Sequence, residues 1–208
     1  MRKILLFVFI VCFSFNSSFA QEGLLEFSKS YFRSDPLSGE FSNFLNHLLN
    51  DPSLQDKQIQ KRTDTSLFYF SGIYKKYDRF FFKPKRVEII LQEQSIKYID
   101  SLLPDTLFIY QLIAYADGNN SGEQDVKKEF ERMHRMFNKK FYSSNYQDLE
   151  SNGIKSGGLH NYFVSYSSIA PITTVWGKLN DEFVLQIDLR IKTSSNRAVL
   201  AASLYNSQ

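Results

Sequence analysis

A strictly alternating segment near the C-terminus constrains the fold more than any other part of this sequence. Its apolar residues occupy every second position and its polar residues lie between them: Phe183, Leu185, Ile187, Leu189 and Ile191 against Gln186, Asp188, Arg190 and Lys192. This period of two predicts a β-strand with one dry face and one wet face. Such a strand is typical of an antiparallel sheet with one solvated side.

Three further segments are rich in aromatic and β-branched residues. Strands are predicted at residues 67–70, 79–82 and 87–91, and Lys83-Pro84-Lys85-Arg86 reads as the hairpin turn between the last two. Residues 106–116 are apolar at both odd and even positions. We therefore expect this strand to be central in the sheet and covered on each side.

The last fifty residues read as a β-meander, because apolar runs alternate with turn-rich segments. The predicted strands are residues 162–167, 172–178, 183–192 and 197–205.

Helical periodicity occurs in two places. Phe41, Phe44, Leu45, Leu48 and Leu49 fall on one face of a helix that Asn50-Asp51-Pro52 ends. A longer amphipathic helix follows the loop at Asp117–Gly122, capped by Asn120 or Ser121, and its apolar stripe is Val126, Phe130, Met133, Phe137 and Phe141. A shorter helix of one or two turns is expected at residues 54–59.

These patterns together predict an α+β fold. The expected architecture has N-terminal helices, a mainly antiparallel β-sheet of about six to eight strands with the long amphipathic helix packed on one face, and a C-terminal β-meander. Residues 21–208 are predicted to form a single domain, with a helical part at 21–66 and the sheet plus helix at 67–208.

Residues 1–20 have the layout of a secretory signal peptide. Arg2 and Lys3 precede an apolar run from Ile4 to Phe15, and Ser18-Phe19-Ala20 predicts cleavage after Ala20. The run is shorter than the roughly 20 residues that a membrane-spanning helix needs, so no transmembrane span is expected. Lipidation of Cys12 is not expected either, since Val11 before it is not small.

Removal of this segment leaves a chain without thiols. Cys12 is the sole cysteine, and the loss of Arg2 and Lys3 lowers the formal net charge from +3 to +1. A cysteine-free exported chain predicts a periplasmic or secreted protein of a bacterial envelope. The near-neutral charge gives no overall attraction to nucleic acid, which is not an expected partner.

Catalytic motifs for zinc, for phosphate loops and for nucleophilic serine are missing from the sequence. Three histidines follow the leader, at positions 47, 134 and 160, and none has a second ligand at metal spacing. If a catalytic site is assembled from distant residues, His160 with Asp148 or Glu150 is the first candidate, because His160 precedes a predicted strand at a loop.

The loop that begins at Asp117 resembles the first part of an EF-hand calcium loop. Asp117, Asn119, Ser121 and Asp125 occupy ligand positions, but Lys128 stands where the bidentate glutamate belongs. We therefore expect no metal and no cofactor, and we interpret the loop as a strand-to-helix turn that uses Asn and Asp for capping.

Basic residues cluster between positions 75 and 86 and alternate with aromatic ones. The candidate anion-binding residues are Lys75, Lys76, Arg79, Lys83, Lys85 and Arg86. The alternative is a solvated edge, where lysines protect a strand from pairing with other chains.

The predicted function is that of an exported, non-catalytic binding protein of a bacterial envelope, acting through a protein–protein or ligand-binding surface. Its expected partner is another envelope or secreted protein. Two alternatives stay open: a secreted hydrolase with dispersed acid–base residues, and a small-molecule or lipid carrier with an aromatic cavity.

Overall fold

A computed structural model describes residues 25–37, 41–63, 67–96, 105–140, 144–148, 159–165 and 172–192. The signal peptide predicted at residues 1–20, Glu150 and the strand expected at 197–205 lie outside these residues. The described elements are a helical segment at residues 25–31, α2 (Phe41–Asn50), β1 (Leu54–Gln60), β2 (Tyr69–Tyr74), β3 (Arg86–Ile96), β4 (Asp105–Ala116), α3 (Asn120–Lys140), β5 (Ser144–Asp148), β6 (Leu159–Ser165), β7 (Ile172–Leu179) and β8 (Glu182–Lys192).

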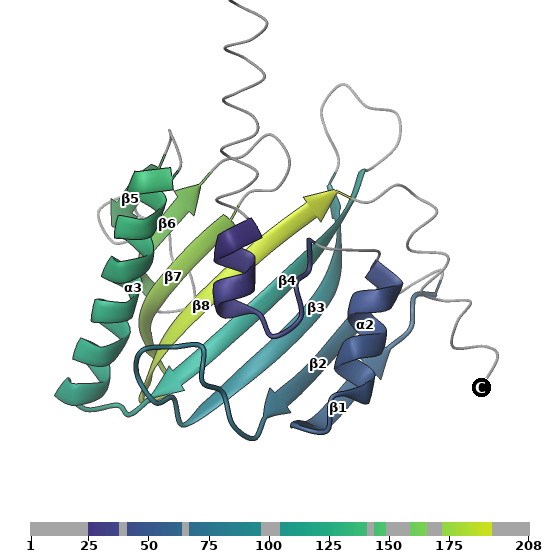
Figure 1. Cartoon of the computed structure of the whole chain (residues 1–208), viewed down its shortest axis with the longest axis horizontal. Coiled ribbons are helices and arrows are strands. Elements are labelled where there is room, and N and C mark those ends of the chain that lie inside the picture. Colours follow the sequence, from purple (N-terminus) through teal and green to yellow (C-terminus); the bar gives the residue numbers. More distant parts are fainter. Residues whose placement is uncertain are drawn as a thin grey trace, which may run out of the picture.

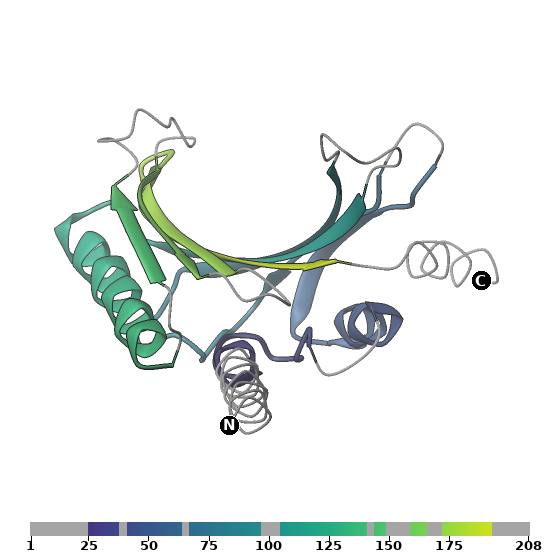
Figure 2. The ribbon, with the colours of Figure 1, turned by 90° about the horizontal axis from the view of Figure 1, so that it is seen from above.

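The strands form one eight-stranded antiparallel sheet in the order β1-β2-β3-β4-β8-β7-β6-β5. The sheet is strongly curved, and the described helices lie on its convex side (Figures 1 and 2). The α+β class, the N-terminal helices and the C-terminal meander are therefore confirmed.

The alternation at residues 183–192 gives one buried apolar face, as the sequence predicts, although Asp188 on the other face is also buried. Leu185, Ile187 and Leu189 are fully buried on the convex side of β8. A tight turn joins β7 to β8, with Asn180 and Asp181 at φ 48° and 62°. Two successive positive φ values are those of a type I′ turn, which matches the twist of a two-residue hairpin and suits Asn and Asp.

The core lies between the convex side of the sheet and the helices. On α2, Phe41, Phe44, Leu45 and Leu48 are buried, as the periodicity predicts. The ring of Phe41 stacks on Phe108 of β4 with centroids 3.9 Å apart. On α3, Val126, Phe130 and Met133 are buried, and the helix packs against β4, β7 and β8. The side chains of Phe137 and Phe141 lie outside the described residues.

Three local predictions are wrong. Residues 54–60 form strand β1 instead of a helix, because its backbone pairs with β2 at the sheet edge, where six successive exposed side chains are tolerated. The segment 79–82 is no strand and 83–86 is no two-strand turn: residues 75–85 form one long connection, and β3 begins at Arg86. This connection is held by aromatic packing, since Phe80 lies against Tyr31 and Phe82.

The prediction for β4 is correct on one side only. β4 is central, and Phe108, Leu112 and Ala114 are buried under the helices. On its other side, Ile109 and Tyr115 are buried and Gln111 and Ile113 are half-buried, although no described helix lies on the concave side of the sheet (Figure 2). The described helices therefore cover β4 on one side only (Figure 2).

Candidate functional site

The candidate site is the concave side of the sheet, formed by alternate residues of three neighbouring strands. The strand register places Glu88, Ile113 and Gln186 in one row, Ile90, Gln111 and Asp188 in the next, and Gln92, Ile109 and Arg190 in a third, from β3, β4 and β8 respectively. We call these nine residues the concave face. Its three rows mix carboxylate, amide and guanidinium groups with isoleucine, in contrast to the apolar convex side.

Asp188 lies in the middle row of this concave face. Its residue surface is only 7% exposed. The Nε2 atom of Gln111 donates a hydrogen bond to Oδ1 of Asp188 over 2.8 Å. The Nε2 atom of Gln186 donates to Oδ1 and Oδ2 of Asp188 over 3.0 and 3.1 Å. The two amides therefore fix the orientation of the carboxyl group.

The charge on this carboxyl group is disfavoured by its surroundings. Burial raises the pKa of Asp188 above its usual value, against the opposing effects of the two glutamine hydrogen bonds and of the positive charge on Arg190. The buried Nε atom of Arg190 finds no acceptor among the described residues. The face thus holds a desolvated carboxyl group next to a guanidinium with an unused donor.

The Asp188→Asn variant tests this pKa. A raised folded-state pKa means that, just above pH 3.8, the folded state holds this proton more tightly than the unfolded chain. The free energy of unfolding therefore falls as pH rises through that window, and the penalty persists at neutral pH. We expect denaturant unfolding to show Asp188→Asn gaining stability relative to the natural chain as pH rises.

The Gln111→Ala variant is the matched control. It keeps the carboxyl group and removes a hydrogen bond that lowers the Asp188 pKa, so the fall in stability with pH should extend to higher pH. A constant stability difference between Asp188→Asn and the natural chain at every pH would contradict the raised pKa.

A network of ion pairs lies at one end of the concave side. Glu182 accepts two bonds from Arg86, at 2.7 and 2.9 Å, and lies 3.3 Å from Nζ of Lys85. These bonds lower the pKa of Glu182, with the Arg86 hydrogen bond as the largest cause. The Arg86 guanidinium stacks on Tyr115, whose hydroxyl donates to Glu88 over 3.2 Å.

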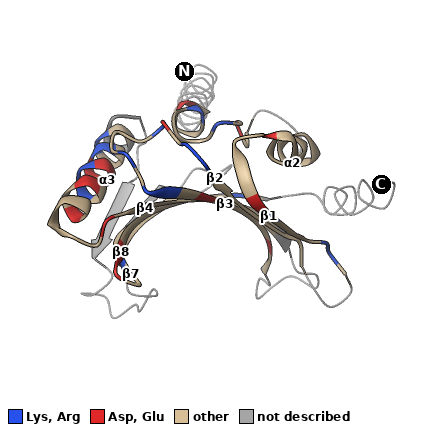
Figure 3. Cartoon of the chain, turned by 90° about the horizontal axis from the view of Figure 1, so that it is seen from below, with Lys and Arg blue, Asp and Glu red and all other residues tan. Residues whose placement is uncertain are grey.

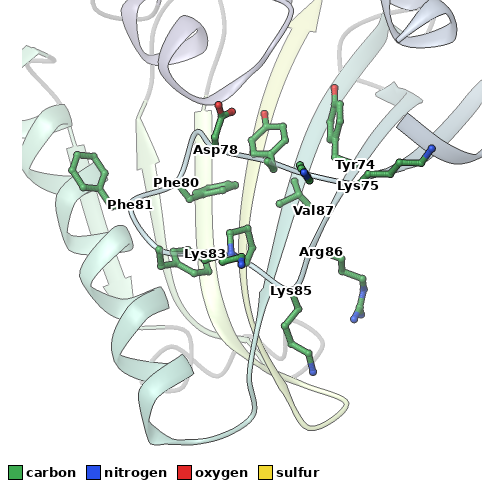
Figure 4. Close-up of a pocket in the computed structure, with 13 residues that line it drawn as sticks. Tyr74, Lys75, Asp78, Phe80, Phe81, Lys83, Lys85, Arg86 and Val87 are labelled. Atoms are coloured by element: carbon green, nitrogen blue, oxygen red, sulfur yellow. The ribbon is translucent and has the colours of Figure 1, made fainter. Parts of the chain in front are cut away.

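The basic cluster of the sequence falls on residues 75–85, which we call the basic loop, and on Arg86. With residues 74 and 87, the loop surrounds a pocket of about 640 Å³ that all the candidate anion-binding residues except Arg79 line. Figure 4 shows Lys75 extending away from Lys85 and Arg86. Lys85 pairs with Asp117 and Glu182, whereas Lys75, Lys76, Arg79 and Lys83 are exposed.

Two of the four calcium candidates, Asn119 and Asp117, have structural partners, while Ser121 is exposed and Asp125 half-buried on α3. The side chain of Asn119 accepts a hydrogen bond from the backbone of Gly122 over 3.0 Å, so Asn119 caps α3 in place of the expected Asn120 or Ser121. Asp117 lies 3.4 Å from Lys85. Within the described ranges, no group of three His, Cys, Asp or Glu residues is arranged to hold a metal ion.

The catalytic candidates lie at the far edge of the sheet. His160 is within strand β6, not before it, and Asp148 ends β5. The backbone of Asp148 pairs with Asn161, which follows His160. The side chains of these residues lie outside the described part of the chain, so the pairing of His160 with Asp148 or Glu150 stays a prediction. His47 lies on the exposed side of α2, and His134 on α3 is half-buried.

Sequence reasoning did not single out Asp188, Gln111 or Gln186. The alternation in β8 places Asp188 and Gln186 on the wet face, but it does not show that this face is curved or that Gln111 lies opposite. Several aromatic residues, among them Phe41, Phe108 and Trp176, pack in the core.

The fold defines an α+β protein built on one curved antiparallel sheet. Comparison with protein-family models, with curated proteins and with solved structures finds no match. Of the helices that the structure describes, none is sufficiently long and apolar to cross a membrane.

Proposed function

We propose that this chain is an exported protein of a bacterial envelope that acts by binding and performs no catalysis of its own. The signal-peptide pattern of residues 1–20 and the thiol-free remainder support the compartment. The expected partner is another envelope or secreted protein, or a ligand that carries hydroxyl, amide or carboxylate groups.

The observation that carries this proposal is the carboxyl group of Asp188 at the centre of the concave face. A desolvated carboxyl group weakens a fold unless its hydrogen bonds compensate, and such groups cluster at functional sites. The adjacent amides and the half-buried side chain of Arg190 can bond hydroxyl, amide or carboxylate groups of a partner. The isoleucines between them offer apolar contact area.

Photo-crosslinking from defined positions tests this surface whatever the chemistry of the bound molecule. A benzophenone amino acid replaces Ile113 on the concave face in one variant and the exposed Lys128 of α3 in the other. Helix α3 carries residues of both charge signs (Figure 3). After irradiation in intact cells, intact-mass spectrometry of the purified chain measures adducts of any size.

We expect adducts at position 113 that Asp188→Asn reduces at least about fivefold, because the substitution replaces one carboxyl oxygen acceptor by an amide donor. The variant with the crosslinker at position 128 should give few adducts. Equal labelling at both positions, no labelling at position 113, or labelling that is insensitive to Asp188→Asn would refute the concave face as the binding surface.

A secreted hydrolase is the second candidate, and the raised pKa of Asp188 is the observation that favours it. A carboxyl group that retains its proton more readily can act as a general acid. Turnover of chromogenic esters or glycosides that Asp188→Asn lowers about a hundredfold or more would favour this candidate over the binding protein.

A further inference from the structure

The basic loop exposes the side chain of Phe81 to solvent, and contacts with the rest of the fold hold the loop backbone in place. Phe81 is 81% exposed, while its neighbour Phe80 is buried and Phe82 is half-buried. The backbone nitrogen of Phe81 donates to Oε2 of Glu129 over 3.2 Å, which ties the loop to α3. The guanidinium of Arg132 lies 4.1 Å from the centre of the Phe81 ring.

The loop is anchored at its other points as well. The hydroxyl of Tyr77 donates to the backbone carbonyl of Tyr31, and the backbone nitrogen of Lys85 donates to the backbone carbonyl of Tyr115 over 2.8 Å. Arg33 donates to the carbonyl of Lys76. Because contacts hold both flanks, Phe81 is presented by a fixed backbone.

The basic loop that carries this ring also carries exposed positive charge. Lys75, Lys76, Arg79 and Lys83 are exposed on the same loop, and the one acidic residue there, Asp78, lies 3.9 Å from Arg33. Lys75 points away from Lys85 and Arg86, so these basic groups do not converge on one small anion (Figure 4). Lysines that point in different directions can each pair with an anionic group when the partner surface carries many such groups. An aromatic ring at the border of such a surface can bury apolar area in it.

We propose that the basic loop docks the protein on an anionic lipid membrane, with Phe81 entering the interface and the four exposed basic side chains contacting headgroup phosphates. The contact is peripheral, and it adds to any binding on the concave face without depending on it.

Co-sedimentation with lipid vesicles tests this surface, using the protein in the form in which it is purified from the cells that express it. We expect binding to vesicles that contain phosphatidylglycerol and little binding to pure phosphatidylcholine. Phe81→Ala should weaken binding about tenfold, and the Lys75→Gln/Lys83→Gln double variant should weaken it by about tenfold or more. Both changes are at exposed side chains, and circular dichroism checks that the variants fold.

The Lys57→Gln/Lys178→Gln double variant is the charge-matched control, because it removes the same charge from β1 and β7. It should bind like the natural chain. Absence of binding to phosphatidylglycerol vesicles, an equal loss in the control, or Phe81→Ala binding like the natural chain would overturn the proposal. Preferential binding to heparin or to a DNA duplex would reassign the loop to another polyanion.

Discussion

Replacing Glu129 with alanine is expected to lower the free energy of unfolding by about 3 kcal/mol. The side chain of Glu129 is 1% exposed and lies among three elements. It accepts hydrogen bonds from the hydroxyl of Tyr31 at 3.0 Å, from the backbone nitrogen of Phe81 at 3.2 Å and from Nε of Arg132 at 3.2 Å.

Alanine would leave all of these donors without their common acceptor. Tyr31 is fully buried, so its hydroxyl would lose a partner that water does not readily replace. Arg132 also donates to the Tyr31 hydroxyl and is partly exposed, so it can regain water more easily. We therefore expect loosening of the segment 25–31 and the basic loop, with α3 still attached to the sheet.

Two variants separate this effect from a general loss on the helix. Glu129→Gln keeps an acceptor and removes the charge, so it should cost about 1 kcal/mol. Glu131→Ala changes an exposed residue of the same helix and should lie within about 0.5 kcal/mol of the natural chain. Urea unfolding and hydrogen exchange at residues 25–31 measure the effect. An alanine variant as stable as Glu131→Ala would show that the cluster does not stabilise the fold.

Gly118→Ala is expected to destabilise the protein by about 3 kcal/mol. Gly118 lies in the turn between β4 and α3, and a Cβ atom there would lie 1.7 Å from the backbone oxygen of Asp181. That oxygen belongs to the turn between β7 and β8, whose backbone is fixed by two positive φ values. The clash therefore cannot be relieved by rotating a side chain.

Thermal unfolding and urea unfolding measure the loss, with Ser121→Ala as the control. Ser121 is exposed at the start of α3, and its replacement should change stability by less than about 0.5 kcal/mol. If Gly118→Ala unfolds at the same urea concentration as Ser121→Ala, the two turns do not touch in solution.

The parts of the fold that the sequence predicted are those with strong periodicity. The alternation in β8 and the spacing of Phe41, Phe44 and Leu48 in α2 each define a buried face without reference to distant residues. The same local reasoning failed at β1. Its seven residues include one buried side chain, Leu54, so their strand conformation comes from pairing with β2 and not from their own pattern.

The site was harder to predict because it depends on shape. Phe80, Phe81 and Phe82 read as a strand, but tertiary packing buries Phe80 and leaves Phe81 outside. The wet face of β8 identifies Asp188 as polar but not as buried, since its burial arises from the curvature of the sheet and from Gln111 on β4. No motif encodes a curved surface.

The strand order also bears on how this molecule acquires its site during folding. β1 to β4 form one antiparallel series of neighbours along the chain and β5 to β8 form another, and the two series meet only where β4 pairs with β8. Gln111 and Asp188, 77 residues apart, join across that seam. Closing so long a loop is entropically slow compared with hairpin formation, so each half can gain its local hydrogen bonds first. The polar centre of the concave side then exists only after the two halves have merged, and a chain arrested before that step has strands but no site.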